Sequence, residues 1–126
     1  MRYPETDQMG VAHHSHFLVW FEIGRTELLR AHGCTYADLE ASGVWMPVIE
    51  VSCRYLSPAR YDDELEVETI LEDMTRVTAT FSYRISRAGT QLATGATRHA
   101  ATDEKGAPRR LPEALRALLA REREPR

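Results

Sequence analysis

The stretch YPETDQMGVAHHSHFLVWFEIGRTELLR, Tyr3–Arg30, decides the fold, because its second half has the periodicity of one long amphipathic helix. One face recurs at intervals of four, three and four residues, through Phe17, Phe21, Gly24 and Leu28. The pattern predicts a helix from about Ser15 to His32, with Ser15 as its cap and Gly33 as the left-handed residue that ends it. Gly24 lowers helix propensity, so we expect it to mark a close backbone approach.

Beyond Val44 the hydrophobic period changes from about 3.6 to 2, which is typical of strands. Four alternating segments, separated by turn residues, run over 49–55, 64–72, 77–85 and 92–102. Pro47 predicts an edge strand or a bulge at the start of the first segment. In the last segment, Gly95 and Ala96 leave space for a packed element, and the long helix could fill it.

Two shorter helices are predicted beside these strands. TYADLEASG, Thr35–Gly43, opens with a Thr-x-x-Asp cap and closes on glycine, and Pro112 opens a terminal helix. We therefore expect an α+β fold in which an antiparallel sheet wraps one long helix, within a single domain, 1–126. The strand near Pro47 pairs least obviously within the chain, which suggests dimerisation by edge pairing.

The composition argues against several classes of protein. The formal net charge is -3, so no global basic field recruits nucleic acid or an anionic membrane. No apolar run is long enough for membrane insertion as a helix, and no signal-peptide pattern follows Met1. Cys34 and Cys53 do not form a CxxC pair, and we expect both to be thiols in the cytoplasm.

The residues just before the long helix suggest chemistry. Asp7 precedes three histidines, His13, His14 and His16, and the backbone amides at a helix N-terminus are unpaired and carry partial positive charge. A substrate carbonyl lodged at these amides would be polarised, and Asp7 could act on it. In the alternative interpretation, Asp7 bonds its own backbone in a turn and the histidines are surface residues.

Two further alternatives concern other side chains of this stretch. A metal site on the histidines is disfavoured, because adjacent histidines point apart and no HExxH motif supports them. Glu22 could be a helix-borne nucleophile, although Arg25, three residues later, favours a structural ion pair. We therefore expect neither a metal nor a role for Glu22 in the reaction.

The stretch matches at most positions the pattern Y-x-E-T-D-x-x-G-V-V-Y-H-x-x-Y-L-x-x-F-E-x-x-R-T-E-x-L-R. It therefore resembles the acyl-CoA thioesterases of the hotdog fold, in the 4-hydroxybenzoyl-CoA thioesterase and YbgC-like subgroup. The chain departs from the pattern at His13 and Phe17, where the pattern has tyrosine, and at His16. The resemblance continues more weakly through YLSPARYDDELEV and the final strands, and it implies a five-stranded sheet around the helix.

Carried over by position, the resemblance makes Asp7 the catalytic aspartate. It makes His14 the residue whose backbone amide polarises the thioester carbonyl, with its side chain as a second candidate. It implies weaker substrate contacts at Gly10, Val11, His13, Val48, Arg60 and Arg76, the two arginines serving the nucleotide phosphates. It also implies that coenzyme A is part of the substrate, that no other cofactor is needed, and that the protein is a homodimer or a dimer of dimers.

We therefore predict hydrolysis of an acyl-CoA, or of an acyl-carrier-protein thioester, to free acid and thiol. Because a thiol has a pKa of about 8.5, it leaves without a strong general acid, and one carboxylate can suffice. Asp7 could be a general base on water, or a nucleophile that forms a mixed anhydride. The alternatives are a non-catalytic acyl-CoA-binding module and a hotdog dehydratase, although the Glu-Thr-Asp segment argues against the dehydratase.

Overall fold

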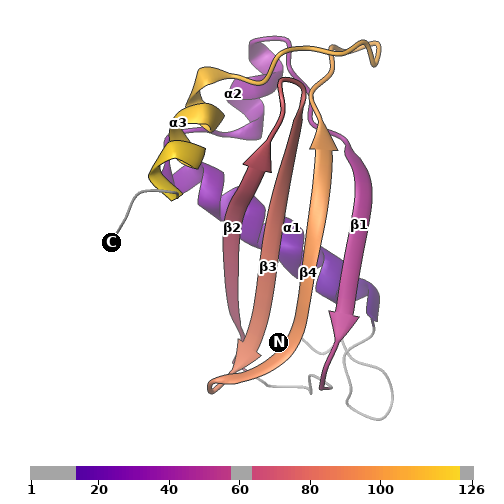
Figure 1. Ribbon diagram of the computed structural model, residues 1–126, viewed down its shortest axis with the longest axis vertical. Helices are drawn as coiled ribbons and strands as arrows, with labels where there is room; N and C mark the ends of the chain where they lie inside the picture. The colour runs from indigo at the N-terminus through magenta and orange to yellow at the C-terminus, as the bar shows by residue number, and fades with distance from the viewer. Residues whose placement is uncertain (1–13, 58–63, 123–126) are drawn as a thin grey trace.

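The computed structural model of the chain describes residues 14–57 and 64–122, and the side chains of residues 17–57 and 64–121 among them. The elements of this part are α1 (His14–Ala31), α2 (Tyr36–Ala41), β1 (Val48–Tyr55), β2 (Glu66–Met74), β3 (Thr78–Arg87), β4 (Thr90–Ala100) and α3 (Glu113–Glu122). The strands form one antiparallel sheet in the order β1-β4-β3-β2. Figure 1 shows α1 crossing one face of this sheet, with α2 and α3 at one end of it.

The predicted α+β architecture is confirmed, but the strand count is wrong for the described part of the chain. Four strands are present there, not the five that the family pattern implied. The four strands are the four segments whose side chains alternate in the sequence. The fifth strand came from the resemblance alone and has no alternating segment of its own within 14–57 and 64–122.

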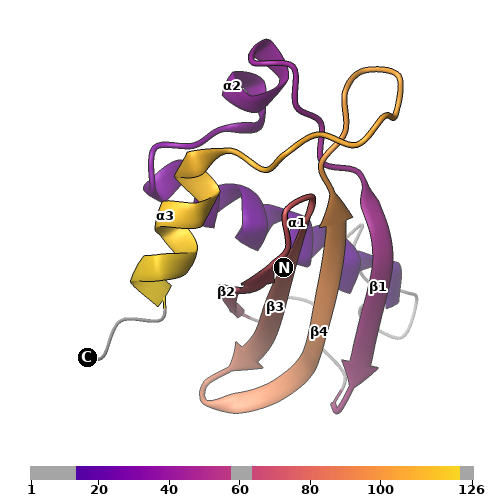
Figure 2. The same cartoon turned by 45° about the horizontal axis from the view of Figure 1, so that its top comes forward.

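α1 lies diagonally across the inner face of the sheet, and two aromatic contacts along the helix define the crossing. Near the start of α1, the ring of Phe17 meets Tyr55 of β1 edge-on, with centroids 5.1 Å apart. One turn further on, Phe21 stacks on Tyr83 of β3 with centroids 4.5 Å apart. The start of the helix therefore lies at β1, and its later turns lie over the middle of the sheet (Figure 2).

Two glycines permit this close packing, as the sequence predicted. A Cβ atom on Gly95 of β4 would collide with the ring of Phe21 and would lie 2.7 Å from the backbone oxygen of Ser52. A Cβ atom on Gly24 of α1 would collide with the hydroxyl oxygen of Thr69 on β2. Each glycine therefore marks a point where a side chain would push α1 and the sheet apart.

The boundaries of α1 differ slightly from the prediction. The helix begins at His14, so Ser15 lies inside the first turn and is not the cap. The end is as predicted, because Gly33 has a φ of 75° and the amides of Gly33 and Cys34 donate to the carbonyls of Arg30 and Leu29. A helix of 18 residues spans about 27 Å, which is long enough to cross the whole sheet.

β1 is an edge strand of the sheet that the described residues form, as Pro47 predicted. Its pairing with β4 shifts register between Val48 and Glu50, just after the proline. Val48, Ile49 and Val51 are 45%, 53% and 46% exposed, so much of the apolar surface of this strand is uncovered in the single chain. An edge strand with exposed apolar side chains is suited to pairing with another chain.

The shorter helices also follow their sequence signals. Thr35 caps α2 by accepting a hydrogen bond from the Asp38 amide at 3.1 Å. α3 starts directly after Pro112, and three leucines in and just before it are buried, Leu111, Leu115 and Leu118. Among the described helices, none is both long and apolar enough to cross a membrane.

We predict that Gly95→Ala lowers the free energy of unfolding by about 2 kcal/mol or more, because the new methyl group meets both an aromatic ring and a backbone carbonyl. Urea denaturation measures this loss. Thr94→Ala is the matched control, since the neighbouring side chain points to the opposite face of the same strand. If both variants unfold like the wild type, the packing of Phe21 does not depend on this gap.

Candidate active site

The N-terminal end of α1 is the candidate reaction centre. The first amides of an α-helix have no partner within the helix and carry partial positive charge, so they can accept a developing oxyanion. Here the helix begins at His14, and the contact between Phe17 and Tyr55 holds this end against β1. An electropositive helix end therefore lies beside the open edge of the sheet (Figure 1).

The sequence predicted several other residues at this centre. Five of them lie outside the described residues: Asp7, Gly10, Val11, His13 and Arg60. His14 is the first residue of α1, and its backbone amide belongs to the first helical turn, as predicted. The described part of the candidate site is therefore the helix end itself, rather than the carboxylate that would act there.

The structure does not bring Val48 or Arg76 to this helix end within one chain. Val48 starts the eight-residue strand β1 and Tyr55 ends it, so the two residues are about 23 Å apart at about 3.3 Å per residue. Arg76 lies in the turn between β2 and β3, at the same end of the sheet as Val48 (Figure 1). Both residues are therefore at the opposite end of the sheet from Tyr55 and the start of α1.

A chain of buried hydrogen bonds runs through the core between α1 and the sheet. Nη1 of Arg25 donates to the hydroxyl of Tyr83 at 3.0 Å, and this hydroxyl is 2.5 Å from the hydroxyl of Thr97. Thr97 is in turn 2.9 Å from Nε2 of His99, whose Nδ1 is 3.0 Å from the backbone oxygen of Met46. The chain links α1, β3 and β4 to the segment that leads into β1.

The donor at one end of this hydrogen-bond series, Arg25, and the acceptor at the other end, the Met46 carbonyl, fix the direction of every bond between them. The Met46 carbonyl can only accept, so Nδ1 of His99 carries a proton, and in the neutral ring Nε2 is then an acceptor. Thr97 must therefore donate to His99, and Tyr83 must donate to Thr97. Burial, the largest effect, and the nearby charge of Arg25 together lower the pKa of His99 to about 4, although the hydrogen bond to Met46 acts in the opposite direction.

The predicted ion pair between Glu22 and Arg25 is wrong for the described part of the chain. Arg25 is only 7% exposed, and its Nε donates to the hydroxyl of Tyr36 at 2.7 Å while Nη1 serves Tyr83. Glu22 is exposed to solvent. The guanidinium is drawn into the core by two tyrosine hydroxyls that are distant in sequence, so a spacing of three residues along the helix does not reveal its partners.

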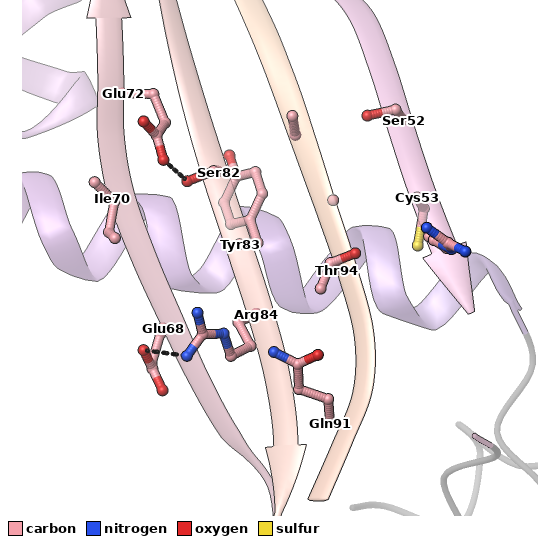
Figure 3. A pocket seen from close by; sticks show the side chains of 13 residues that line it. Ser52, Cys53, Glu68, Ile70, Glu72, Ser82, Tyr83, Arg84, Gln91 and Thr94 are labelled. Carbon is pink, nitrogen blue, oxygen red and sulfur yellow. Dashed lines mark hydrogen bonds and ion pairs between the residues drawn. The ribbon is translucent and has the colours of Figure 1, made fainter. Parts of the chain in front are cut away.

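A hollow lies on the outer face of the sheet and is lined by charged and polar residues. Both of its carboxylates are engaged across the strands: Glu68 pairs with Arg84 at 3.7 Å, and Glu72 accepts a hydrogen bond from Ser82 at 2.7 Å (Figure 3). Figure 3 shows α1 behind the sheet as seen from this hollow. The sheet therefore separates these carboxylates from the helix end, and we do not assign the reaction to them.

Comparison with known proteins assigns the chain to a family. Residues 9–94 match the family model described as the thioesterase superfamily. The chain belongs to the thioesterase superfamily. It is accordingly a thioester hydrolase, and the match includes the start of α1 and most of the sheet.

Two curated proteins and one solved structure illustrate what the chain is similar to. The acyl-CoA thioester hydrolase YbgC of Escherichia coli O6:H1 is 36% identical over 90 residues, which cover 71% of this chain and 67% of that protein. The 1,4-dihydroxy-2-naphthoyl-CoA hydrolase of Synechococcus sp. RCC307 is 31% identical, with 94% of this chain and 95% of that protein covered. The crystal structure of hypothetical protein TT1821 from Thermus thermophilus aligns with a TM-score of 0.88 at 40% identity, covering 95% and 93% of the two chains.

Metal ligation is not supported by the residues that the structure describes. Within them, no three side chains of histidine, cysteine, aspartate or glutamate are grouped so that they could hold a metal ion. The alternative metal site involved Asp7 and the histidines before the helix, whose side chains lie outside the described set. Metal-free hydrolysis by this superfamily member therefore stays a prediction.

The sequence did not predict that Tyr83, Thr97 and His99 form a series of buried hydrogen bonds with Arg25. Thr97 and His99 alternate with outward-facing residues on β4, and Tyr83 occupies the inner face of β3. The sequence places these three polar side chains on the inner faces of neighbouring strands. Because polar groups in a core need partners, this pattern could have indicated buried hydrogen bonds among them. Their pairing with Arg25 required the crossing angle of α1, which the sequence pattern does not contain.

We predict that the folded protein loses stability as the pH falls from about 6.5 to about 4. Over this range the unfolded chain binds a proton at position 99 that the folded chain excludes, and the loss approaches about 3 kcal/mol below pH 4. Urea denaturation as a function of pH measures it. His99→Gln should flatten this part of the profile, whereas His32→Gln, at an exposed position, should leave it unchanged. Identical profiles for all three proteins would contradict the assignment to His99.

Proposed function

We propose that the chain hydrolyses an acyl-CoA thioester to a free acid and coenzyme A at the N-terminal end of α1. The observation that carries the proposal is the start of α1 at His14, seven residues after Asp7, which leaves the first-turn amides free to bind the carbonyl oxygen. The acyl-CoA activities named for YbgC and for the Synechococcus hydrolase support coenzyme A as the carrier. No cofactor or metal is proposed beyond the coenzyme A of the substrate.

Asp7 is the proposed catalytic carboxylate, by either of two routes. As a general base, it takes a proton from water while the water oxygen attacks the carbonyl carbon, and the carbon–sulfur bond then breaks to release the thiolate. As a nucleophile, its own oxygen attacks, the thiolate leaves, and water opens the mixed anhydride. In both routes the amides of the first turn, including that of His14, bind the oxyanion, and Gly10, Val11 and His13 contact the substrate.

We further propose that two copies of the chain pair along β1. The exposed apolar residues of this edge strand and of the first turns of α1 support this arrangement: Val48, Ile49 and Val51 on β1 and Leu18, Val19 and Ile23 on α1. Antiparallel pairing would set the start of one β1 beside the end of the other. Val48 of one copy would then lie near the helix end of its partner, where substrate contact is proposed for it.

Two other functions compete with this proposal. In a non-catalytic module the same helix end would bind an acyl-CoA without cleaving it, and Asp7 would close a turn. A dehydratase would eliminate water from a hydroxyacyl thioester and leave the thioester intact. Incubation with short, medium and aromatic acyl-CoAs distinguishes hydrolysis from both, because it alone releases thiol. Binding without thiol release across the whole panel would favour the module.

We predict that Asp7→Asn lowers turnover by about a hundredfold or more, because an amide can neither take the proton nor attack the carbonyl. Thiol release from the best acyl-CoA of the panel measures the effect, and thermal unfolding verifies the fold. Asp38→Asn, which changes an exposed carboxylate on α2, is the control and should retain wild-type turnover. Full activity of the Asp7 variant would remove this residue from the chemistry.

The same assay separates two roles for His14. A backbone amide survives substitution of the side chain, so near-native turnover in His14→Ala would leave only the amide role. A marked loss with an unchanged melting temperature would assign a role to the imidazole as well. In either case the result refines the proposal for Asp7 without replacing it.

We predict that the wild-type protein sediments as a dimer or a larger oligomer, and that Val51→Lys shifts it toward monomer. Val51 is 46% exposed on the edge strand, and a lysine there would place a charge in the proposed apolar interface. Analytical ultracentrifugation measures the change. Ile70→Lys, at a position 43% exposed on the opposite edge strand, should leave the oligomer intact. A monomeric wild type would exclude the proposed pairing.

A further inference from the structure

A pocket of about 430 Å³ lies between α3 and the turn that joins β2 to β3. The end of β2 contributes Met74, the turn contributes Thr75 and Arg76, and α3 contributes Arg116, Leu119 and Ala120. The Leu111 amide donates to the carbonyl oxygen of Arg76 at 2.9 Å, which ties the turn to the segment that enters α3. This hydrogen bond therefore joins the two walls of the pocket at Arg76.

Arg116 lines this pocket and has a donor without an acceptor. Its Nη2 atom is buried and has no hydrogen-bond partner among the described residues. Buried polar groups are almost always paired, and a charged donor left without a partner is especially unfavourable. This nitrogen therefore indicates an acceptor that residues 14–57 and 64–122 do not provide.

The charge of the pocket lining is entirely positive. The six described residues that line it include two arginines and no carboxylate. Within the described part of the chain, neither Arg76 nor Arg116 forms an ion pair. By contrast, Arg30, Arg84 and Arg98 each pair with a glutamate. The pocket thus presents two uncompensated guanidinium groups.

We propose that this pocket binds a phosphate group. A guanidinium presents parallel donors whose spacing matches two phosphate oxygens, and two such groups can share one dianion. The family resemblance suggested Arg60 and Arg76 as phosphate contacts, and Arg116 lines the same pocket as Arg76. The apolar side chains of Leu119 and Ala120 also line the pocket, and they could contact the organic part of a phosphate ester.

The pocket is remote from the proposed reaction centre of the same chain. Arg121 on α3 bonds His32 just after the end of α1, and α1 is about 27 Å long, so α3 lies at the other end of the helix from His14. The phosphate could belong to the nucleotide of a coenzyme A bound across two copies of the chain, or to free inorganic phosphate. The two sources share the same chemistry and can be separated by binding.

Calorimetric titration of the full chain with coenzyme A, pantetheine and inorganic phosphate tests the site. We expect Arg116→Gln and Arg76→Gln each to weaken binding of the phosphate-bearing ligand at least tenfold. Arg121→Gln, on the same helix outside the pocket, should bind like the wild type, and thermal unfolding verifies each fold. Loss of affinity for coenzyme A with unchanged pantetheine binding supports the nucleotide as the source. Loss of phosphate binding alone supports free phosphate.

Wild-type affinity of both glutamine variants for both phosphate-bearing ligands would overturn the site. The expectation that coenzyme A binds here rests on the proposed function. Calorimetry, however, measures binding independently of thioester hydrolysis. A protein that binds coenzyme A through Arg116 and releases no thiol from any acyl-CoA would therefore retain this site and lose the proposed activity.

Discussion

The contact on which the rest of the structure depends is the packing of Phe21 between Tyr83 and the gap at Gly95. It lets α1 lie close to the sheet, and the absence of a side chain at Gly24 allows the same approach at β2. These contacts fix the diagonal direction in which α1 crosses the sheet. Because interiors are densely packed, a different diagonal would require different small residues in the sheet.

The same diagonal explains the polar core. It carries Arg25 over Tyr83, from which directed hydrogen bonds continue through Thr97 and His99 to the Met46 carbonyl. A buried guanidinium with hydroxyl partners is tolerable only while each donor finds its acceptor. A protonated His99 would have a donor on both ring nitrogens, and Nε2 could then no longer accept the hydrogen bond from Thr97. The hydrogen-bond series therefore favours a neutral imidazole in the folded state.

The diagonal also places the positive end of α1 beside the open edge strand, and this couples the proposed chemistry to assembly. One chain holds its helix end near Tyr55, whereas Val48 and Arg76 lie at the far end of the sheet. Residues that the family pattern assigns to one substrate are thus separated within a single chain. A second copy paired along β1 would reduce that separation, since antiparallel strands exchange their ends.

The sequence by itself determined the elements and most of their ends, because periodicity, the cap at Thr35 and the glycine at position 33 act over a few neighbouring residues. It also predicted the helix end as the candidate site and the family to which the chain belongs. Only the tertiary structure decided the partners of Arg25 and the unpaired nitrogen of Arg116. These depend on how α1 and α3 cross the sheet, and side chains that are distant in sequence meet only once that geometry exists.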